Sequence, residues 1–255
     1  MTREIALETL QVTIAEGAAT LTLQRPAKRN ALNLAMCHDL VTAASALGGD
    51  DSVRVVLVRA AGPVFCAGAD LEERRSMDVS AVRARRLAAF DAYHALEALP
   101  IPVVAIVCGP AVGSGCEIAA ACDFVVATPD ASFRTPEALW GTVGATQRLP
   151  RVLGARLAKD LMFTGRTLSA AEALTAGLVT RLVSSTDLEH ELGVMVATIV
   201  GASPAALAAA KRCLDAPLAA ARREALVAEI AAIDGLLADP ETRAGVTSLG
   251  AHRSR

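Results

Sequence analysis

The stretch Val112-Gly113-Ser114-Gly115-Cys116-Glu117 combines a potential oxyanion site with a carboxylate. An apolar run precedes it, and the small residues that follow at 118–122 are typical of a helix. A chain that leaves a buried strand and enters a helix here directs free N–H groups and the positive end of the helix dipole to one place. An oxygen that gains negative charge there would be stabilised, and Glu117 could act on the bound group. A tight connection with a solvated glutamate would have the same sequence, so both interpretations stay open.

The composition excludes several classes of function. The chain has 255 residues, enough for one large domain or a domain with a small appendage. It is 53% hydrophobic but only 3% aromatic, so its core must consist mainly of Ala, Val, Leu and Ile. The net charge is −2 and no long run of one sign occurs, which argues against nucleic acid or an anionic membrane as a partner.

Most of the cysteines lie in apolar stretches and indicate buried thiols rather than a metal site. No C-x-x-C pair occurs and only four histidines are present, so we expect neither zinc nor an iron–sulfur cluster. Thiols in apolar surroundings are typical of a reducing compartment, and we expect the cytoplasm. The first ten residues carry charges where a signal peptide needs an apolar core, and no uncharged apolar run is long enough to span a membrane. The cysteines are Cys37, Cys66, Cys108, Cys116, Cys122 and Cys213.

The elements that must position Glu117 can be predicted from hydrophobic periodicity. Strands are expected at 10–15, 19–23, 53–58, 103–107, 124–127, 132–134 and 178–183, and helices at 34–47, 82–99, 204–214 and 219–237. A short helix should start at Pro136-Glu137, with Thr135 as its cap, and Ser169 with Glu172 forms a capping box. The polar segment 70–80 is expected to be a mobile loop. Strand–helix alternation followed by a helical last third predicts an α/β domain with a helical C-terminal part.

Three arginines occur near the start of the helix expected at 82–99. Arg83, Arg85 and Arg86 oppose the helix dipole there. A phosphate-binding patch would explain them, but ordinary surface solvation is the interpretation that we prefer.

Four stretches, in this order, resemble the crotonase (enoyl-CoA hydratase/isomerase) superfamily. They are Asn30-Ala31-Leu32, Phe65-Cys66-Ala67-Gly68-Ala69-Asp70-Leu71, Gly113-Ser114-Gly115-Cys116-Glu117 with Cys122-Asp123, and Pro136-Glu137 with Thr146-Gln147-Arg148-Leu149. The resemblance implies a crotonase-like ββα spiral core at residues 1–200. It further implies a helical C-terminal region at 201–255 for trimerisation, and hence a homotrimer or a dimer of trimers.

The resemblance also implies an activity and its catalytic residues. An enoyl-CoA hydratase, a lyase of the kind used in fatty acid β-oxidation, adds water across the 2,3 double bond of a 2-enoyl-CoA thioester. By position, the amides of Ala69 and Ser114 would hold the thioester oxygen as it becomes an enolate. Glu137 would be the principal proton donor and Glu117 the activator of water. Coenzyme A would enter as part of the substrate, and no other cofactor is expected.

The resemblance places the coenzyme over two segments of the chain. Lys28 or Arg29 would meet the phosphates, although an exposed turn would explain both residues equally well. The amides near Ala67 would meet the adenine. Gly68, Asp70, Leu71 and Gly113 complete the expected set of coenzyme contacts. Asp70 should cap its own loop rather than take part in catalysis.

Departures from the family pattern keep other functions open. After Glu137 the loop containing Gly141 and Gly144 reaches Thr146 about three residues early, without the usual proline. The tail at 243–248 also differs. Isomerase, hydrolase or decarboxylase chemistry and non-catalytic coenzyme A binding therefore remain alternatives. A serine hydrolase built on Ser114 lacks the glycines of a G-x-S-x-G elbow. A dinucleotide-dependent oxidoreductase would need a third glycine.

Overall fold

Two β-sheets of unequal size form the centre of the protein, whose computed structural model describes residues 2–238. The larger sheet has the order β1 (Arg3–Ala6), β2 (Leu10–Ala15), β3 (Ala18–Leu23), β4 (Val55–Ala60), β5 (Val103–Val107), β7 (Phe124–Ala127) and β10 (Arg181–Leu182). The smaller sheet consists of β6 (Pro110–Val112), β8 (Ser132–Arg134) and β9 (Thr167–Ser169). In the larger sheet β1, β2 and β3 pair antiparallel, and the strands from β3 to β10 pair parallel.

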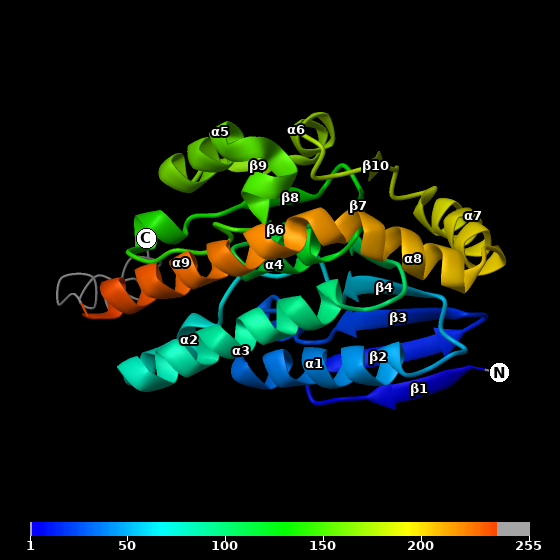
Figure 1. Ribbon diagram of the computed structural model, residues 1–255, viewed down its shortest axis with the longest axis horizontal. Helices are drawn as coiled ribbons and strands as arrows, with labels where there is room; N and C mark the ends of the chain where they lie inside the picture. The colour runs from blue at the N-terminus through cyan, green and yellow to red at the C-terminus, as the bar shows by residue number, and fades with distance from the viewer. Residues whose placement is uncertain (1, 239–255) are drawn as a thin grey trace.

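Helices pack around the two sheets (Figure 1). The α-helices are α1 (Leu34–Gly48), α2 (Leu71–Arg75), α3 (Val79–Glu97), α4 (Ser114–Ala121), α5 (Leu149–Thr164), α6 (Ala170–Thr175), α7 (Leu188–Gly201), α8 (Pro204–Asp215) and α9 (Ala219–Ala238). Residues 2–238 also contain the 3₁₀ turns η1 (Pro26–Lys28), η2 (Glu137–Trp140) and η3 (Ala216–Leu218), of which η3 joins α8 to α9.

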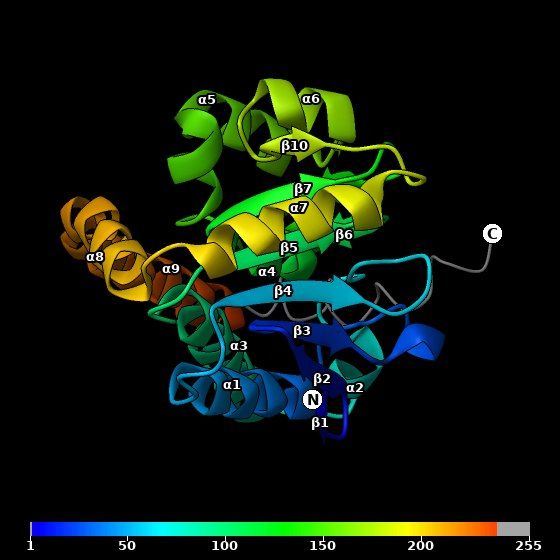
Figure 2. The same cartoon turned by 90° about the vertical axis from the view of Figure 1, so that its right-hand side faces the viewer.

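The parallel strands are buried on both faces, which explains the nearly continuous apolar run of β5. Helix α7 covers one face, where Leu188, Leu192 and Met195 pack on residues of β4, β5 and β7 (Figure 2). Helices α1, α3 and α4 contribute to the larger core on the other face. The sheet is therefore a rigid support for the loops at the carboxyl ends of its strands.

Most predicted elements are confirmed, and the predicted α/β class with a helical C-terminal part is correct. The hairpin of β2 and β3, the helices α1, α3, α8 and α9, and the capping box of Ser169 and Glu172 all occur. The strands β1, β6 and β9 were missed, since runs of three or four residues carry little periodicity. The strand expected at 178–183 is reduced to β10, which has two residues.

Two local predictions were wrong. Residues 70–80 are not a loop throughout, because the Asp70 side chain caps α2 within them. Thr135 does not cap η2: the cap position is Pro136, and no side chain bonds there. Within residues 2–238 no helix by itself has the length and apolarity of a membrane span. The pair α7 and α8, bent by 100°, passes that test only jointly. The tail at 243–248 lies outside the described residues.

Candidate active site

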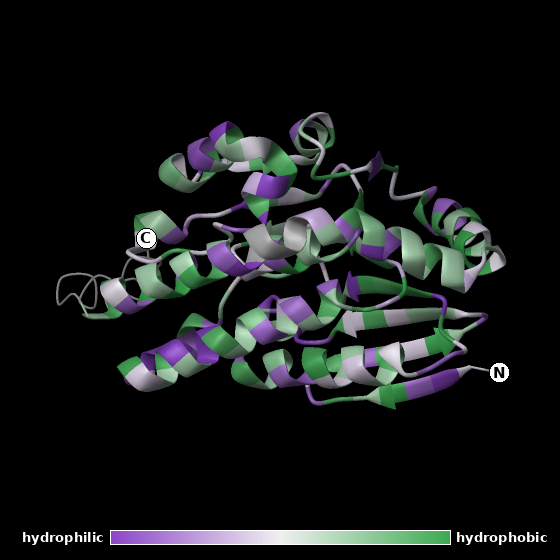
Figure 3. Ribbon diagram, in the orientation of Figure 1, coloured by the Kyte–Doolittle hydropathy of each residue, from purple (hydrophilic) through white to green (hydrophobic). Residues whose placement is uncertain are grey.

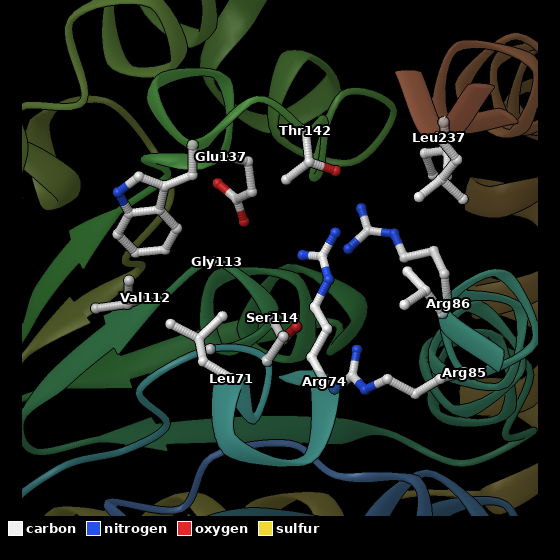
Figure 4. Close-up of a pocket in the computed structure, with 15 residues that line it drawn as sticks. Leu71, Arg74, Arg85, Arg86, Val112, Gly113, Ser114, Glu137, Thr142 and Leu237 are labelled. Carbon is white, nitrogen blue, oxygen red and sulfur yellow. The ribbon is translucent and has the colours of Figure 1, made fainter. Parts of the chain in front are cut away.

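One pocket brings together residues from α2, α3, α4, η2 and α9 (Figure 4). Its described lining is Gly68, Ala69, Leu71, Arg74, Val82, Arg85, Arg86, Val112, Gly113, Ser114, Glu137, Trp140, Thr142, Ile233 and Leu237. Helix α9 returns across the molecule and contacts α3, so two of its apolar residues close one side of the pocket. Part of the region predicted for trimerisation thus serves the pocket of its own chain.

The glycine-rich stretch forms the wall of this pocket at the start of α4. Ser114 is the first residue of the helix, so its N–H has no acceptor within the helix. Gly113 precedes it with φ 52° and ψ −108°. A Cβ on Gly113 would stand 2.5 Å from Glu137 Oε1, closer than any side-chain carbon could approach. Glycine is therefore required both for the backbone angles and for the approach of Glu137.

Ala69 lines the same pocket. Leu32 pairs with this segment, because its N–H donates to Gly68 O at 2.8 Å and its carbonyl accepts from Asp70 N–H at 2.8 Å. In such a parallel bridge the residue between the two bonded neighbours directs its own N–H to the opposite side. The Ala69 amide consequently points away from Leu32. The two predicted amide donors, Ala69 and Ser114, share one pocket wall.

Glu137 is the one carboxylate among the described residues that line the pocket. It is 7% exposed, and its Oε2 is buried without a hydrogen-bond partner in the described part of the chain. Burial raises the pKa of Glu137 to about 7, and the nearby Glu117 acts in the same direction, while Arg86 opposes the shift. Near neutral pH this carboxyl can therefore either donate or accept a proton.

Glu117 lies behind the pocket wall, with its side chain completely buried in α4. Its Oε1 lies 3.5 Å from Arg86 Nη2, and its Oε2 accepts a hydrogen bond of 3.4 Å from Arg148 Nη1. Burial raises the pKa of Glu117, and the two guanidinium groups oppose that shift. The structure thus places Glu137 in the pocket wall and Glu117 one layer further in.

A third carboxylate reaches this cluster from α9. Arg86 Nη2 donates to Glu229 Oε1 at 3.1 Å and to Val143 O at 2.7 Å, and Thr146 Oγ1 donates to Glu229 Oε2 at 2.6 Å. The expectation of surface solvation was wrong for Arg85 and Arg86, whose side chains are 5% and 13% exposed and are ion-paired. Glu229 was missed altogether, because no motif marks it and only the return of α9 brings it here.

The expected coenzyme contacts are only partly gathered at the pocket. Gly68, Leu71 and Gly113 line it. Asp70 accepts from Glu72 N–H and Glu73 N–H, and from Arg25 Nη2 at 2.9 Å, so it caps α2 as expected.

The remaining coenzyme candidates lie on or beside the η1 turn. Lys28 is exposed and donates to Glu72 at 2.5 Å, and Arg29 is exposed. The Ala67 N–H donates to Arg29 O at 3.0 Å, so this amide is not free for an adenine in this conformation.

Asn30 has a structural role beside these residues. Its side chain is completely buried and donates to the carbonyls of Ala61 and Val64 at 2.8 Å, while its Oδ1 accepts from Arg25 N–H at 2.9 Å. These bonds hold the turn at η1 against the loop after β4. The Asn30-Ala31-Leu32 motif thus places Leu32, which in turn orients Ala69.

The described residues supply neither a histidine base for Ser114 nor a cluster of metal ligands. The histidines at 38, 94 and 190 are exposed, and none of them lines the pocket, so Ser114 has no base of that kind there. No group of three or more His, Cys, Asp or Glu side chains within residues 2–238 has the arrangement of a metal site.

Comparison with known proteins gives a consistent match. Residues 13–252 match the family model described as enoyl-CoA hydratase/isomerase. The chain is 36% identical over 225 residues to a probable enoyl-CoA hydratase of Mycobacterium leprae, covering 87% of both chains. It is 34% identical over 254 residues to a probable enoyl-CoA hydratase of Rhizobium meliloti, covering 98% of this chain and 97% of the relative. A crystal structure of an enoyl-CoA hydratase/isomerase from Pseudoalteromonas atlantica superposes with a TM-score of 0.85 at 29% identity, covering 95% and 97% of the two chains.

Proposed function

Because the chain belongs to the enoyl-CoA hydratase/isomerase family, we propose that it is an enzyme that adds water across the 2,3 double bond of a 2-enoyl-CoA thioester. Relatives named probable enoyl-CoA hydratase at 34–38% identity support hydration as the reaction. The arrangement of Ala69, Ser114 and Glu137 around one pocket supports the same reaction from the geometry.

In this proposal the amides of Ala69 and Ser114 bind the thioester oxygen. Attack of water at C3 shifts electrons through C2 to that oxygen, which becomes an enolate. Fixed N–H donors stabilise the enolate more than the neutral thioester, and removal of one such donor costs about 3 kcal/mol of barrier in other enzymes. The position of Ser114 at the start of α4 adds the positive end of the helix dipole.

The two glutamates would move the protons. Glu117 takes a proton from the attacking water as the C3–O bond forms, and Glu137 delivers a proton to C2 as the enolate collapses. The observation that carries this step is that Glu117 Oε1 and Glu137 Oε2 are both buried without a hydrogen-bond partner within residues 2–238. A water molecule at either oxygen would satisfy a buried acceptor, and the proposal requires one that reaches both carboxyl groups.

Coenzyme binding, cellular location and oligomeric state are parts of the same proposal. Coenzyme A would bind as part of the substrate, with Lys28 and Arg29 near its phosphates. Six free cysteines support a reducing location such as the cytoplasm. The exposed side chains of Phe163 and Leu214 support contacts between copies in a homotrimer or a dimer of trimers, which sedimentation can test.

Isomerisation of an enoyl-CoA is the second candidate. A single carboxyl group can move a proton between C4 and C2 of a 3-enoyl thioester, and Glu137 alone among the described pocket residues has that capacity. The position of Glu117 favours this alternative, because Glu117 does not line the pocket and is ion-paired with Arg86 at 3.5 Å and with Arg148 at 3.4 Å.

One spectrophotometric assay separates the two. Hydration of crotonyl-CoA removes the absorbance of the conjugated thioester, whereas isomerisation of 3-hexenoyl-CoA creates it. We expect loss of absorbance with crotonyl-CoA, and at least a hundredfold slower loss with Glu137→Gln. An unchanged spectrum with crotonyl-CoA together with a rise with 3-hexenoyl-CoA would replace hydration by isomerisation.

A further inference from the structure

The pocket wall carries more positive than negative charge. Three arginines line it, Arg74, Arg85 and Arg86, against the single carboxylate of Glu137 among the described residues. Hydrophilic colouring gathers where α2 meets the first turns of α3, the two elements that supply these arginines (Figure 3). A pocket for a purely hydrocarbon acyl group needs no cation beside it, so these guanidinium groups require an explanation.

Two of the arginines are neutralised by the protein itself. Arg85 Nε lies 3.3 Å from Glu73 Oε2, and Arg85 also donates to the carbonyl of Leu32. Arg86 pairs with Glu229 at 3.1 Å and with Glu117 at 3.5 Å. Their roles are structural: Arg85 holds Glu73, which accepts from the Leu34 N–H at the start of α1 at 2.9 Å, and Arg86 holds the acid cluster behind the pocket.

Arg74 is not neutralised by any of the residues that the structure describes. Its Nε is buried and has no hydrogen-bond partner among residues 2–238. Burial lowers the pKa of Arg74, and so does the positive charge of Arg85 and Arg86. Figure 4 shows its guanidinium directed into the space bordered by Glu137, Thr142 and Arg86. A partly buried cation without a counter-ion is costly, and an anion bound in the pocket would remove that cost.

We propose that the acyl group of the substrate carries a carboxylate and that the Arg74 guanidinium binds it. A planar guanidinium matches a carboxylate with two parallel hydrogen bonds. Leu71, Val82 and Leu237 line the same pocket and can contact the methylene chain between the thioester and the acid. The inference rests on the proposed function, since it places the thioester oxygen at the amides of Ala69 and Ser114 in this pocket.

The anion could also come from the coenzyme, whose phosphates share the chemistry of a carboxylate. We favour the acyl group because Arg74 lines the same pocket as the two amides and Glu137, the groups expected around the reacting carbons. The residues expected near the phosphates, Lys28 and Arg29, lie on the η1 turn and do not line this pocket.

Binding of saturated esters tests the inference without requiring turnover. Calorimetry would give dissociation constants for succinyl-, glutaryl- and adipyl-CoA, each against its neutral partner of equal chain length, butyryl-, pentanoyl- and hexanoyl-CoA. We expect at least one acid to bind about tenfold or more tighter than its partner. Arg74→Gln should abolish that ratio, and Arg74→Lys should restore part of it. Arg75→Gln is the matched control, because Arg75 is the next residue of α2, is exposed and does not line the pocket.

Two results of these binding measurements would overturn the inference. Equal affinity for acid and neutral esters at every length in the wild-type protein would overturn the inference. So would an equal loss for both kinds of ester in Arg74→Gln, which would assign Arg74 to the coenzyme phosphates. If Arg74→Gln does not fold by circular dichroism, the acid-to-neutral ratio in Arg74→Lys decides in its place. Hydration of crotonyl-CoA is measured separately, so failure of the proposed function is distinguished from failure of the carboxylate site.

Discussion

Glu137 Oε1 lies 2.5 Å from the point where a Cβ on Gly113 would stand. The backbone at the start of α4 and the carboxylate at the start of η2 therefore fit together only because residue 113 has no side chain. This close approach places Glu137, the expected proton donor, next to the expected oxyanion site at Ser114. Glycine at position 113 is thus required by the space that Glu137 needs as well as by the backbone angles.

Gly113→Ala should impair catalysis far more than stability. The added methyl would displace the Glu137 carboxylate, and φ 52° would be strained for alanine. We expect hydration of crotonyl-CoA to slow by about a hundredfold or more, since misplacement by 1 Å can have that effect. Gly177→Ala is the control: its φ is 83° but nothing lies within 4 Å of the new methyl, so it should lower stability by about 1 kcal/mol and leave the rate unchanged. Equal rate losses would show that backbone strain alone is responsible.

The pKa of Glu137 should make stability depend on pH. Its pKa is raised from 4.5 to about 7, so the folded state binds the proton more tightly than the unfolded state. The free energy of unfolding should therefore fall as pH rises from about 4.5 to 7, by about 3 kcal/mol from this group. Glu137→Gln removes the effect, so the variant should gain about that much relative to wild type between pH 5 and pH 8. Urea unfolding at the two pH values measures the difference, and an unchanged difference would contradict the assignment.

The same pKa predicts the pH dependence of the reaction. If Glu137 delivers the proton to C2, its protonated form is the active one, and kcat/KM for crotonyl-CoA should fall as pH rises through about 7. A rate that rises through the same range would mean that Glu137 acts first as a base. Initial rates from pH 5.5 to 9 with the wild-type enzyme decide between these two roles.

The sequence predicted the parts of this site that depend on local pattern. The turn at Gly113, the free amide of Ser114 and the apolar run of β5 all follow from neighbours in the chain. The cap at Asp70 was also foreseen, although the helix that it caps was not. These features depend on residues a few positions apart, where spacing and residue type are informative.

The charged network behind the pocket depends on contacts between distant segments. Arg86 and Glu229 are separated by 143 positions, and their pairing requires α9 to return over α3. The arginines of α3 were visible in the sequence, but their burial was not, because nothing in the local pattern shows which element covers them. The place of Arg74 in the pocket was not foreseen either, because the polar segment 70–80 was expected to be a mobile loop.

Glu117→Gln should lower both stability and activity. The substitution leaves Arg86 and Arg148 without one of their buried counter-charges, a change that typically costs about 3 kcal/mol. If Glu117 activates water, hydration should also slow by about a hundredfold or more. Glu97→Gln is the control, because it removes a partner of Arg148 at 2.9 Å and leaves Glu117 and Glu137 unchanged. It should destabilise the protein and retain most of the activity, and a full rate in Glu117→Gln would exclude Glu117 from the mechanism.

Glu229→Gln should loosen α9 from the pocket. Glu229 accepts from Arg86 and Thr146, so the change weakens the charged anchor that holds the helix whose Ile233 and Leu237 line the site. We expect faster amide hydrogen exchange over residues 223–238 and a KM for crotonyl-CoA raised by about tenfold, because substrate must then order the helix on binding. Asp234→Asn is the control on the same helix: it removes the ion pair of Asp234 with Arg83 of α3, which is exposed and should contribute little. If both variants raise exchange and KM equally, α9 is held by general surface charge. If neither changes them, its apolar contacts suffice and Glu229 acts only on Arg86.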